Sequence, residues 1–296
     1  MTEQLDLLLS RFAATTGAWT PDTPLAAMRA GLDGIFTAYP LVPGTRVLPQ
    51  HGDMEGEWVE APGVAQDRAM LLIHGGGFSM GSARAHRAYA SHLSAACDLR
   101  VFTADYRLVP EHIFPAAHDD CLAAWDFLVG TGIKPRDIVV CGDSAGGGLA
   151  LSLAIALRDS ARAGPGSLIL VSPWADMTAA GESYSDPAID DPVASREMTL
   201  AMAAAYLGPA DPRDPRASPV YADLSAMPPL LIIVGSREVF LDEARTIARG
   251  VKDHGGESRL EVWPGMIHQF PLHVGALDEA TGAIDQIGAF ARGRFG

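Results

Sequence analysis

The chain has 296 residues, of which 48% are hydrophobic and 20% are charged, a balance typical of a globular protein with one large core. This composition excludes a disordered or fibrous protein. The net charge of −14 would repel nucleic-acid phosphates and anionic lipid head groups, and no local cluster of Lys and Arg offsets it. We therefore expect neither nucleic acid nor a membrane as a partner.

The N-terminal stretch "MTEQLDLLLSRF" has acidic Glu3 and Asp6 where a secretory signal peptide would carry basic residues. No uninterrupted apolar run of the chain reaches the roughly 18 residues that a membrane span needs. The three cysteines, Cys97, Cys121 and Cys141, are odd in number and form no C-x-x-C motif, which is typical of reduced thiols. These features predict a cytoplasmic protein, and they leave open whether it is a monomer or a homodimer.

In chain order, the predicted elements begin with two amphipathic helices in residues 1–43, followed by two alternating segments, 45–50 and 56–62, that are typical of an antiparallel sheet edge. Short, nearly continuous apolar runs then predict strands covered by helices on both faces, at 69–75, 137–142, 167–173 and 229–235. Helical segments lie between or after them, at 82–96, 115–130, 144–160 and 241–254. This alternation predicts an α/β fold with a mostly parallel central sheet flanked by helices.

Two segments do not follow this alternation, residues 1–43 and 178–208, the second containing the helical stretch "SREMTLAMAAAYLG". Open α/β folds place their sites at the carboxyl ends of the strands, so we expect both segments to form a helical cap over that edge. The predicted division is 1–43 for the N-terminal part of the cap, 44–177 for the α/β core, 178–208 for the second part of the cap and 209–296 for the rest of the core.

Two stretches fit the G-x-S-x-G pattern of a nucleophilic serine on a sharp turn, "GFSMG" around Ser79 and "GDSAG" around Ser144. Such a turn needs a strand leading in, small neighbours that allow a strained serine backbone, and a helix leading out. The stretch "DIVVCGDSAGGGLALSLAIAL" provides all three, whereas Phe78 and Met80 would crowd a turn at Ser79. We therefore predict Ser144 as the nucleophile.

The glycines of "HGGG" at 74–77, just past a strand end, have a different predicted role. When serine attacks an ester carbonyl, negative charge develops on the oxygen, and backbone N–H groups stabilise it. Gly76 and Gly77 offer two such groups, and Ala145 can add a third. A phosphate-binding loop is disfavoured, because no Lys-Ser or Lys-Thr pair follows either glycine stretch and no G-x-G-x-x-G opens a helix with an acidic residue in place after it.

Together these stretches resemble the bacterial hormone-sensitive-lipase family of α/β-hydrolases. The motifs that carry the resemblance are "HGGGF" at 74–78, "DYRLVPEHIFPAAHDD" at 105–120, "GDSAGG" at 142–147, "SPW" at 172–174 and "PPLLIIVGSREVFLDEA" at 228–244. The resemblance spans about residues 45–290 in the family's order. It implies a capped α/β-hydrolase that cleaves carboxylic esters, in which Gly76, Gly77 and Ala145 match the family's oxyanion hole.

A serine nucleophile needs a base, and in this fold the chain order is serine, carboxylate, histidine. Three histidines follow Ser144. His268 comes directly after the strand "RLEVWPG", at the serine's edge of the sheet, and "GMIHQF" resembles the family's histidine loop. His254 lies at the opposite edge and His273 farther on, near the last helix, where it is expected to be a surface or packing residue. The predicted base is His268.

The carboxylate should follow the strand that ends at Gly235. Glu238 comes within a few residues of that end, whereas Asp242 and Glu243 begin a helix, where acidic residues commonly act as caps and dipole partners. We predict Glu238 as the third member of the triad. The family's commoner residue at this position is aspartate, so Asp242 stays open as the alternative.

The predicted function is a serine carboxylesterase that hydrolyses short-chain esters, with a small-molecule ester as partner and no cofactor. The same triad serves amidases and lactonases, and a non-catalytic ligand-binding member of the fold is a further alternative. We expect a bounded apolar pocket lined by Phe78 and, from the cap, by Met28, Phe36, Tyr184, Met202 and Tyr206.

Other polar residues receive structural interpretations. Arg107 and Glu111 are expected to tie down a buried loop, and His74 and Asp143 to brace the two glycine turns. No H-E-x-x-H motif is present, and His112, His118, Asp119 and Asp120 lack a convincing third-ligand arrangement, so no metal site is predicted.

Overall fold

The computed structural model describes residues 3–20 and 22–295, and an eight-stranded sheet lies at its centre. The strands are β1 (Arg46–Gln50), β2 (Gly56–Glu60), β3 (Ala69–Ile73), β4 (Arg100–Ala104), β5 (Ile138–Asp143), β6 (Ser167–Val171), β7 (Leu230–Gly235) and β8 (Ser258–Trp263). Their order across the sheet is β1-β2-β4-β3-β5-β6-β7-β8. Only β2 runs antiparallel to its neighbours, β1 and β4, and the strands from β4 to β8 are parallel to one another.

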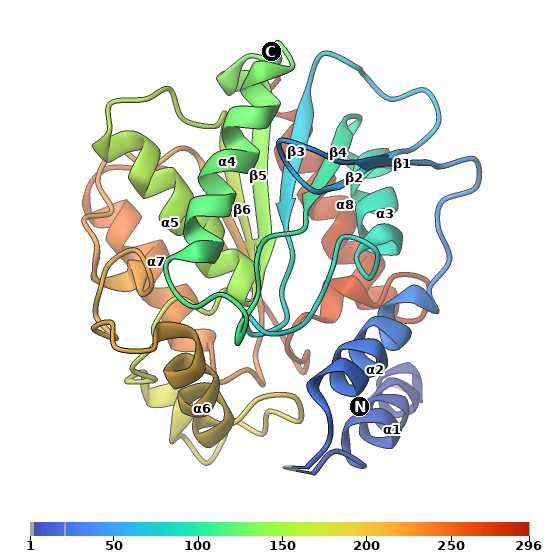
Figure 1. The fold of residues 1–296 in the computed structure, drawn as a ribbon, viewed down its shortest axis with the longest axis vertical. Helices are drawn as coiled ribbons and strands as arrows, with labels where there is room; N and C mark the ends of the chain where they lie inside the picture. Colours follow the sequence, from blue (N-terminus) through green and yellow to red (C-terminus); the bar gives the residue numbers. More distant parts are fainter. Residues whose placement is uncertain (1–2, 21, 296) are drawn as a thin grey trace.

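Helices cover both faces of this sheet (Figure 1). One face carries α3 (Arg87–Cys97) and α8 (Asp278–Arg292), and the other carries α4 (Ala116–Gly130), α5 (Ala145–Asp159) and α7 (Leu241–Asp253). Successive strand residues point to opposite faces, so Met70 and Leu72 of β3 pack on the first side, whereas Leu71 and Ile73 pack on the second. The central strands are therefore apolar throughout, which is why they appear in the sequence as continuous apolar runs.

The remaining helices gather at one end of the molecule (Figure 1). They are α1 (Glu3–Thr16), α2 (Leu25–Thr37) and α6 (Arg196–Leu207). The first two pack through Leu5, Leu8 and Phe36 into the hydrophobic cluster on the α3 and α8 side. The hydroxyl of Ser195 caps α6 by accepting a hydrogen bond from the backbone N–H of Met198 at 3.2 Å. Single 3₁₀ turns lie at η1 (Pro135–Asp137), η2 (Glu182–Tyr184), η3 (Pro219–Tyr221) and η4 (Phe270–Leu272).

The predicted α/β fold is confirmed, including the antiparallel edge formed by β1 and β2. Two details differ. The helix predicted from residue 82 begins at Arg87, because residues 82–86 form turns, and β4 was absent from the predicted strands because "RVFTA" mixes an arginine and a threonine with its apolar residues. Within the described residues, no helix is both long and apolar enough to cross a membrane.

Candidate active site

Ser144 lies on a sharp turn between β5 and α5, with backbone angles φ 53° and ψ −122°. This conformation is strained for a residue with a side chain and is typical of a nucleophile elbow. Two glycines make the turn possible, because a Cβ on Gly142 would run into the carbonyl oxygen of Gly146, and a Cβ on Gly146 into that of Ile73 in β3. The turn places the serine at the carboxyl end of β5 and at the N-terminus of α5.

The second serine of the G-x-S-x-G pair, Ser79, lies in the loop that follows β3. Its backbone carbonyl accepts a hydrogen bond from Nε of Arg29 at 2.7 Å, and its backbone N–H donates to the carbonyl of Gly76 at 3.2 Å. Among the described residues, no side chain forms a hydrogen bond with the Ser79 hydroxyl. The structure therefore gives Ser79 no base.

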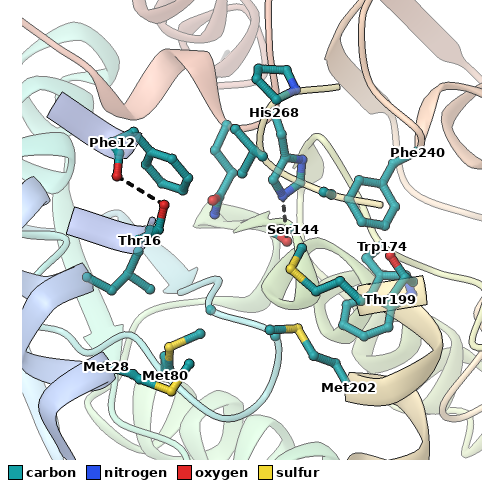
Figure 2. A pocket seen from close by; sticks show the side chains of 18 of the residues that line it. Phe12, Thr16, Met28, Met80, Ser144, Trp174, Thr199, Met202, Phe240 and His268 are labelled. Carbon is teal, nitrogen blue, oxygen red and sulfur yellow. Dashed lines mark hydrogen bonds between the residues drawn. The ribbon is translucent and has the colours of Figure 1, made fainter. Parts of the chain in front are cut away.

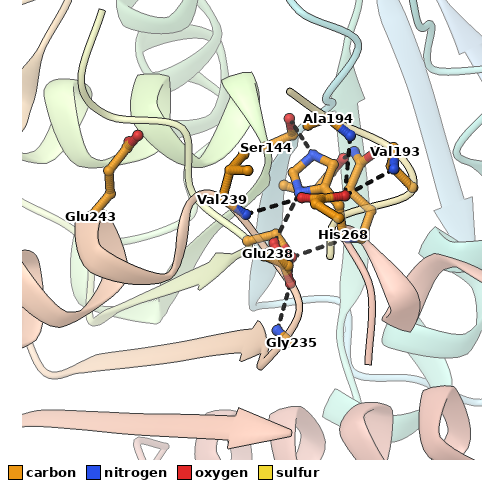
Figure 3. A network of polar contacts seen from close by, with 12 residues as sticks. Ser144, Val193, Ala194, Gly235, Glu238, Val239, Glu243 and His268 are labelled. Carbon is orange, nitrogen blue, oxygen red and sulfur yellow. Dashed lines mark hydrogen bonds and ion pairs between the residues drawn. The ribbon is translucent and has the colours of Figure 1, made fainter. Parts of the chain in front are cut away.

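The imidazole of His268 lies between Ser144 and Glu238 (Figure 3). Its Nε2 is 2.8 Å from Oγ of Ser144, and its Nδ1 is 2.9 Å from Oε2 of Glu238. All three side chains are buried, and that of Glu238 is completely inaccessible to solvent. When Nδ1 donates its proton to the carboxylate, Nε2 is free to accept the proton of the serine hydroxyl.

Glu238 is held by both of its carboxylate oxygens. Oε2 faces His268, while Oε1 accepts hydrogen bonds from the hydroxyl of Ser172 at 2.8 Å and from the backbone N–H of Gly235. Ser172 directly follows β6, so three neighbouring strand ends meet around this carboxylate. These contacts hold the carboxylate of Glu238 beside His268.

The alternative acid, Asp242, lies apart from the histidine. Its carboxylate accepts a hydrogen bond from the backbone N–H of Ser183 at 2.8 Å and pairs with Arg245 at 2.9 Å. The fold therefore brings Glu238, and not Asp242, to His268.

Glu243 does more than the helix-dipole role predicted for it. It is buried and accepts hydrogen bonds from the backbone N–H groups of Ala175 and Asp176 and, at 2.6 Å, from the hydroxyl of Tyr184. The carboxylate thus ties the first turn of α7 to the loop that follows β6. This contact is long-range in the sequence, which is why a local helix-cap pattern did not indicate it.

The electrostatic surroundings favour a protonated His268. Burial by itself would lower the pKa of the imidazole, but the hydrogen bond and the charge of Glu238, with smaller contributions from the charges of Asp191 and Asp143, outweigh burial. The pKa of His268 consequently lies above its ordinary value of 6.5. A histidine of this kind is a stronger base toward the serine proton and stabilises its own charged form.

Asp191 connects the segment before α6 to the loop that carries Glu238. Its carboxylate accepts hydrogen bonds from the backbone N–H groups of Val193 at 2.8 Å, Ala194 at 3.1 Å and Val239 at 3.0 Å. The first two belong to the segment that precedes α6, and the third follows Glu238 directly. One carboxylate therefore fixes the cap segment against the loop that carries the triad acid.

The three residues predicted for the oxyanion hole lie around Ser144. Gly76 and Gly77 line the same cavity as Ser144, and the N–H of Ala145 is the first of helix α5. Within the part of the chain that the structure describes, none of these three N–H groups donates a hydrogen bond to another protein atom. They are available to a developing oxyanion, and the dipole of α5 favours negative charge at the same point.

The loop before these glycines is braced from both sides, as the sequence predicts. Asp143 accepts a hydrogen bond from the backbone N–H of Gly75 at 3.0 Å, and Nδ1 of His74 is 2.7 Å from the carbonyl oxygen of Gly75. The side-chain amide of Gln269, next to His268, also donates to Asp143. The residue before the nucleophile thus joins the glycine loop to the histidine loop.

A cavity of about 410 Å³ opens beside Ser144 and His268 (Figure 2). Core loops contribute Gly76, Gly77, Met80, Ser144, Trp174, Phe240, His268 and Gln269, and the cap contributes Phe12, Thr16, Trp19, Met28, Leu32, Pro192, Val193, Ala194, Met198, Thr199 and Met202. The wall is predominantly apolar and aromatic, as is typical of small-molecule sites.

Of the six residues predicted to line this cavity, only Met28 and Met202 do so. Phe78 and Tyr206 are buried and stack on each other, with ring centroids 3.7 Å apart. Phe36 packs against His86 and His273, in the cluster on the α3 and α8 side. Tyr184 is held by its hydrogen bond to Glu243 and packs edge-on against Phe240.

The aromatic wall residues were not predicted. They are Phe12 and Trp19 from the cap and Trp174 and Phe240 from core loops. Phe240 lies two residues beyond the triad acid, and Trp174 ends the "SPW" motif, so their positions after strand ends could have indicated them. For Phe12, the signal is its place on the apolar side of α1, seven residues after Leu5 and four after Leu8.

Arg107 and Glu111 form ion pairs at the surface, contrary to the prediction, and the buried anchors of their loop are Val109 and Tyr106, whose hydroxyl donates to the carbonyl of His74 at 2.8 Å. Arg107 pairs with Asp120 at 2.7 Å and remains 48% exposed, and Glu111 pairs with Arg29 of α2 at 2.7 Å, also at the surface. The second pair links the cap to the core loop. Because these ion pairs are exposed to solvent, their charged groups avoid the free-energy cost of desolvation.

The two remaining histidines after the serine are distant from the triad chemistry. His254 is exposed at the end of α7, whereas His273 is buried, with Nδ1 2.6 Å from the hydroxyl of Tyr39. Burial lowers the pKa of His273 to about 3. Among the described residues, no three His, Cys, Asp or Glu side chains are grouped in a way that could hold a metal ion.

Comparison with known proteins gives the family of the chain. Residues 70–272 match the model of a protein family that is described as having the α/β-hydrolase fold. An acetyl-hydrolase of Streptomyces hygroscopicus is 38% identical over 241 residues, which cover 81% of this chain and 80% of that protein. An esterase of Acinetobacter venetianus is 34% identical over 90% of this chain and 88% of its own length.

Among solved structures, the crystal structure of an esterase from the bacterial hormone-sensitive-lipase family superposes with a TM-score of 0.95 at 38% sequence identity, over 100% of this chain and 99% of that one. The match therefore includes the cap as well as the sheet. The chain belongs to the bacterial hormone-sensitive-lipase family of α/β-hydrolases and is a carboxylic ester hydrolase.

Proposed function

We propose that this esterase hydrolyses short-chain carboxylic esters through a Ser144–His268–Glu238 triad and an acyl-enzyme intermediate. The observation that carries the proposal is the unbroken hydrogen-bonded line from Oγ of Ser144 through His268 to Glu238, which lies at the floor of an apolar cavity. A hydrogen-bonded nucleophile, base and orienting acid is the arrangement that serine acyl transfer requires.

In the first half-reaction, His268 Nε2 removes the proton of Ser144, and Oγ attacks the ester carbonyl carbon. The N–H groups of Gly76, Gly77 and Ala145 stabilise the negative charge on the carbonyl oxygen. The C–O bond to the alcohol then breaks, and the alcohol leaves with the proton from His268.

In the second half-reaction, His268 removes a proton from water, which attacks the acyl carbon. The bond to Oγ breaks, Ser144 recovers its proton from the histidine, and the free acid leaves. Throughout, Glu238 holds the imidazole with Nδ1 protonated and stabilises the imidazolium that forms in each step.

The preference for short acyl chains rests on the walls of the cavity. Trp174 and Phe240 stand on one side and Phe12 on the other, with methionines between them (Figure 2). Large rings on both sides limit the length of chain that fits beside Ser144. The name of the related acetyl-hydrolase supports the same substrate class.

Two measurements test this proposal. Hydrolysis of p-nitrophenyl butyrate should fall by several orders of magnitude in Ser144→Ala and stay close to wild type in Ser79→Ala, because only Ser144 has a base. For the wild type, kcat/KM along a series from acetate to laurate should peak at a short chain. A maximum at laurate, or an inactive Ser79→Ala beside an active Ser144→Ala, would refute the proposal.

We also propose a cytoplasmic location, which the three buried, free cysteines support. Fractionation of the native host with an antibody against the protein tests it, and recovery in the medium would contradict it.

A further inference from the structure

A second cavity, of about 590 Å³, lies next to the catalytic one. It is bounded by α1, α2 and the segment that follows η4. Its apolar wall includes Leu8, Gly34 and Ile35, and its polar part is formed by Arg11, Thr15, Tyr39 and His273. Glycines contribute no side chain to the space, so a hollow remains where two helices would otherwise close on each other. Nothing in the triad chemistry described above uses this space.

Phe12 of α1 lines both cavities. Of the α1 residues on either side of Phe12, Thr16 lines the catalytic cavity and Leu8 lines the second cavity. In the opposing helix, α2, Met28 lines the catalytic cavity and Ile35 lines the second cavity. The Phe12 side chain thus stands where the two spaces meet.

In Figure 2, Phe12 lies on the α1 side of the catalytic cavity, opposite Phe240 and Trp174. A chain that leaves Ser144 in the direction of α1 therefore meets this ring before it reaches the second cavity. The ring is only partly buried, so a smaller side chain at this position leaves the packing of Leu5 and Leu8 in the core intact.

We propose that Phe12 is a specificity-determining residue that closes the catalytic cavity against the second cavity and so sets the limit on chain length. The second cavity is then a latent subsite for the distal part of a longer aliphatic chain. This inference rests on the proposed function, because it concerns the same ester substrates. The aliphatic chain can belong to the acyl or to the alcohol part of the ester, and substrates of both kinds distinguish the two.

The test begins with Phe12→Ala, which shortens the ring to a methyl group and keeps a strong helix former in α1. Phe12→Leu, which keeps most of the volume, is the matched control. The ratio of kcat/KM for p-nitrophenyl decanoate to that for the butyrate should rise by about tenfold or more in Phe12→Ala, since a few extra buried methylenes have at least that effect. For the alcohol part of the ester, the same ratio is measured as kcat/KM for decyl acetate over that for ethyl acetate, with the released acid as the readout.

A second substitution checks that the longer chain enters the second cavity. Gly34 lies at the exposed rim of that cavity, and a Cβ on it would meet no atom within 4 Å, so Gly34→Leu adds bulk at the rim without a clash and with a better helix former in α2. The double variant Phe12→Ala/Gly34→Leu should lose the gain on long chains that Phe12→Ala shows.

A readout without turnover separates this inference from the proposed function. Binding of 1-decanol, followed by the fluorescence of Trp19 and Trp174 in the cavity wall, should tighten in Phe12→Ala and weaken again in the double variant. A folded Phe12→Ala that gains long-chain activity in neither substrate series, or a gain that Gly34→Leu leaves unchanged, overturns the inference. Wild-type protein that hydrolyses no ester, with 1-decanol binding as expected, would instead refute the proposed function alone.

Discussion

Replacing Glu238 with glutamine changes one atom of the triad and tests how the acid works. In the wild type, Oε1 accepts from two donors, the Ser172 hydroxyl and the Gly235 N–H, while Oε2 accepts from Nδ1 of His268. The glutamine oxygen will occupy the Oε1 position, because both neighbours there are donors. The amide nitrogen then faces Nδ1, which must become an acceptor.

The consequence is that the imidazole of His268 adopts the other neutral tautomer. With Nδ1 unprotonated, the proton of His268 resides on Nε2 and points at Ser144, so the histidine cannot accept the serine proton. The neutral amide also fails to stabilise the imidazolium. Loss of the correct tautomer reduces kcat by up to about 10⁴, which corresponds to about 5.5 kcal/mol at 1.36 kcal/mol for each factor of ten.

The assay is kcat for p-nitrophenyl butyrate together with the melting temperature. Glu238→Gln should keep its fold and its KM, and Glu238→Asp should retain partial activity because it keeps the charge. Asp242→Asn is the matched control, since Asp242 pairs with the half-exposed Arg245 and its loss should cost at most about 1 kcal/mol of stability with kcat unchanged. A nearly active Glu238→Gln beside a folded but inactive Asp242→Asn would refute this reasoning.

Two further predictions concern pH. The pKa of His268 is raised, so the acid limb of the pH profile of kcat/KM should have its midpoint above pH 6.5. Asp191→Asn removes one of the charges that raise this pKa and should move the midpoint to lower pH. An unchanged profile would show that Asp191 only positions the cap segment. For His273, the folded pKa of about 3 lies below the unfolded value of 6.5, so the stability that this residue contributes is complete above pH 6.5 and declines as the pH falls toward 3. Urea unfolding should therefore show wild type losing about 1 kcal/mol more than His273→Gln between about pH 7.5 and about pH 5.5, and equal losses would contradict the assignment.

The residues at strand ends could be predicted from the sequence, because their positions follow from local patterns. Ser144 is flanked by a strand, small neighbours and a helix, so its turn is encoded within a few residues. Glu238 and His268 each come within a few residues of the end of a strand, β7 and β8, and parallel strands bring their carboxyl ends to one edge. Three distant segments could therefore be assembled into one site without knowing how the helices pack.

The pocket lining could not be predicted in the same way, because it depends on how the cap helices are rotated against the core. An amphipathic pattern indicates that α2 has an apolar face, but Met28 of that helix points into the cavity while Phe36 packs into the core. Similarly, Tyr206 and Met202 share α6, and only Met202 reaches the cavity. Apolar character indicates burial and does not indicate which of two apolar surroundings a side chain enters.

The role of Glu243 shows a second limit. Its partners Ala175 and Tyr184 are far from it in the sequence, and no local pattern distinguishes a carboxylate that caps a helix from one that is buried and fully hydrogen-bonded. Only the packing of the loop after β6 against α7 decides between them.

The central claim is that Ser144 is the nucleophile of this esterase. Reaction of the folded wild-type protein with a fluorophosphonate, followed by peptide mass spectrometry, tests it most directly, because the reagent bonds to a serine that a neighbouring base activates. We predict a single adduct on the peptide that contains Ser144, with esterase activity lost in proportion to labelling. An adduct on Ser79, or full labelling of Ser144 with activity retained, would contradict the claim.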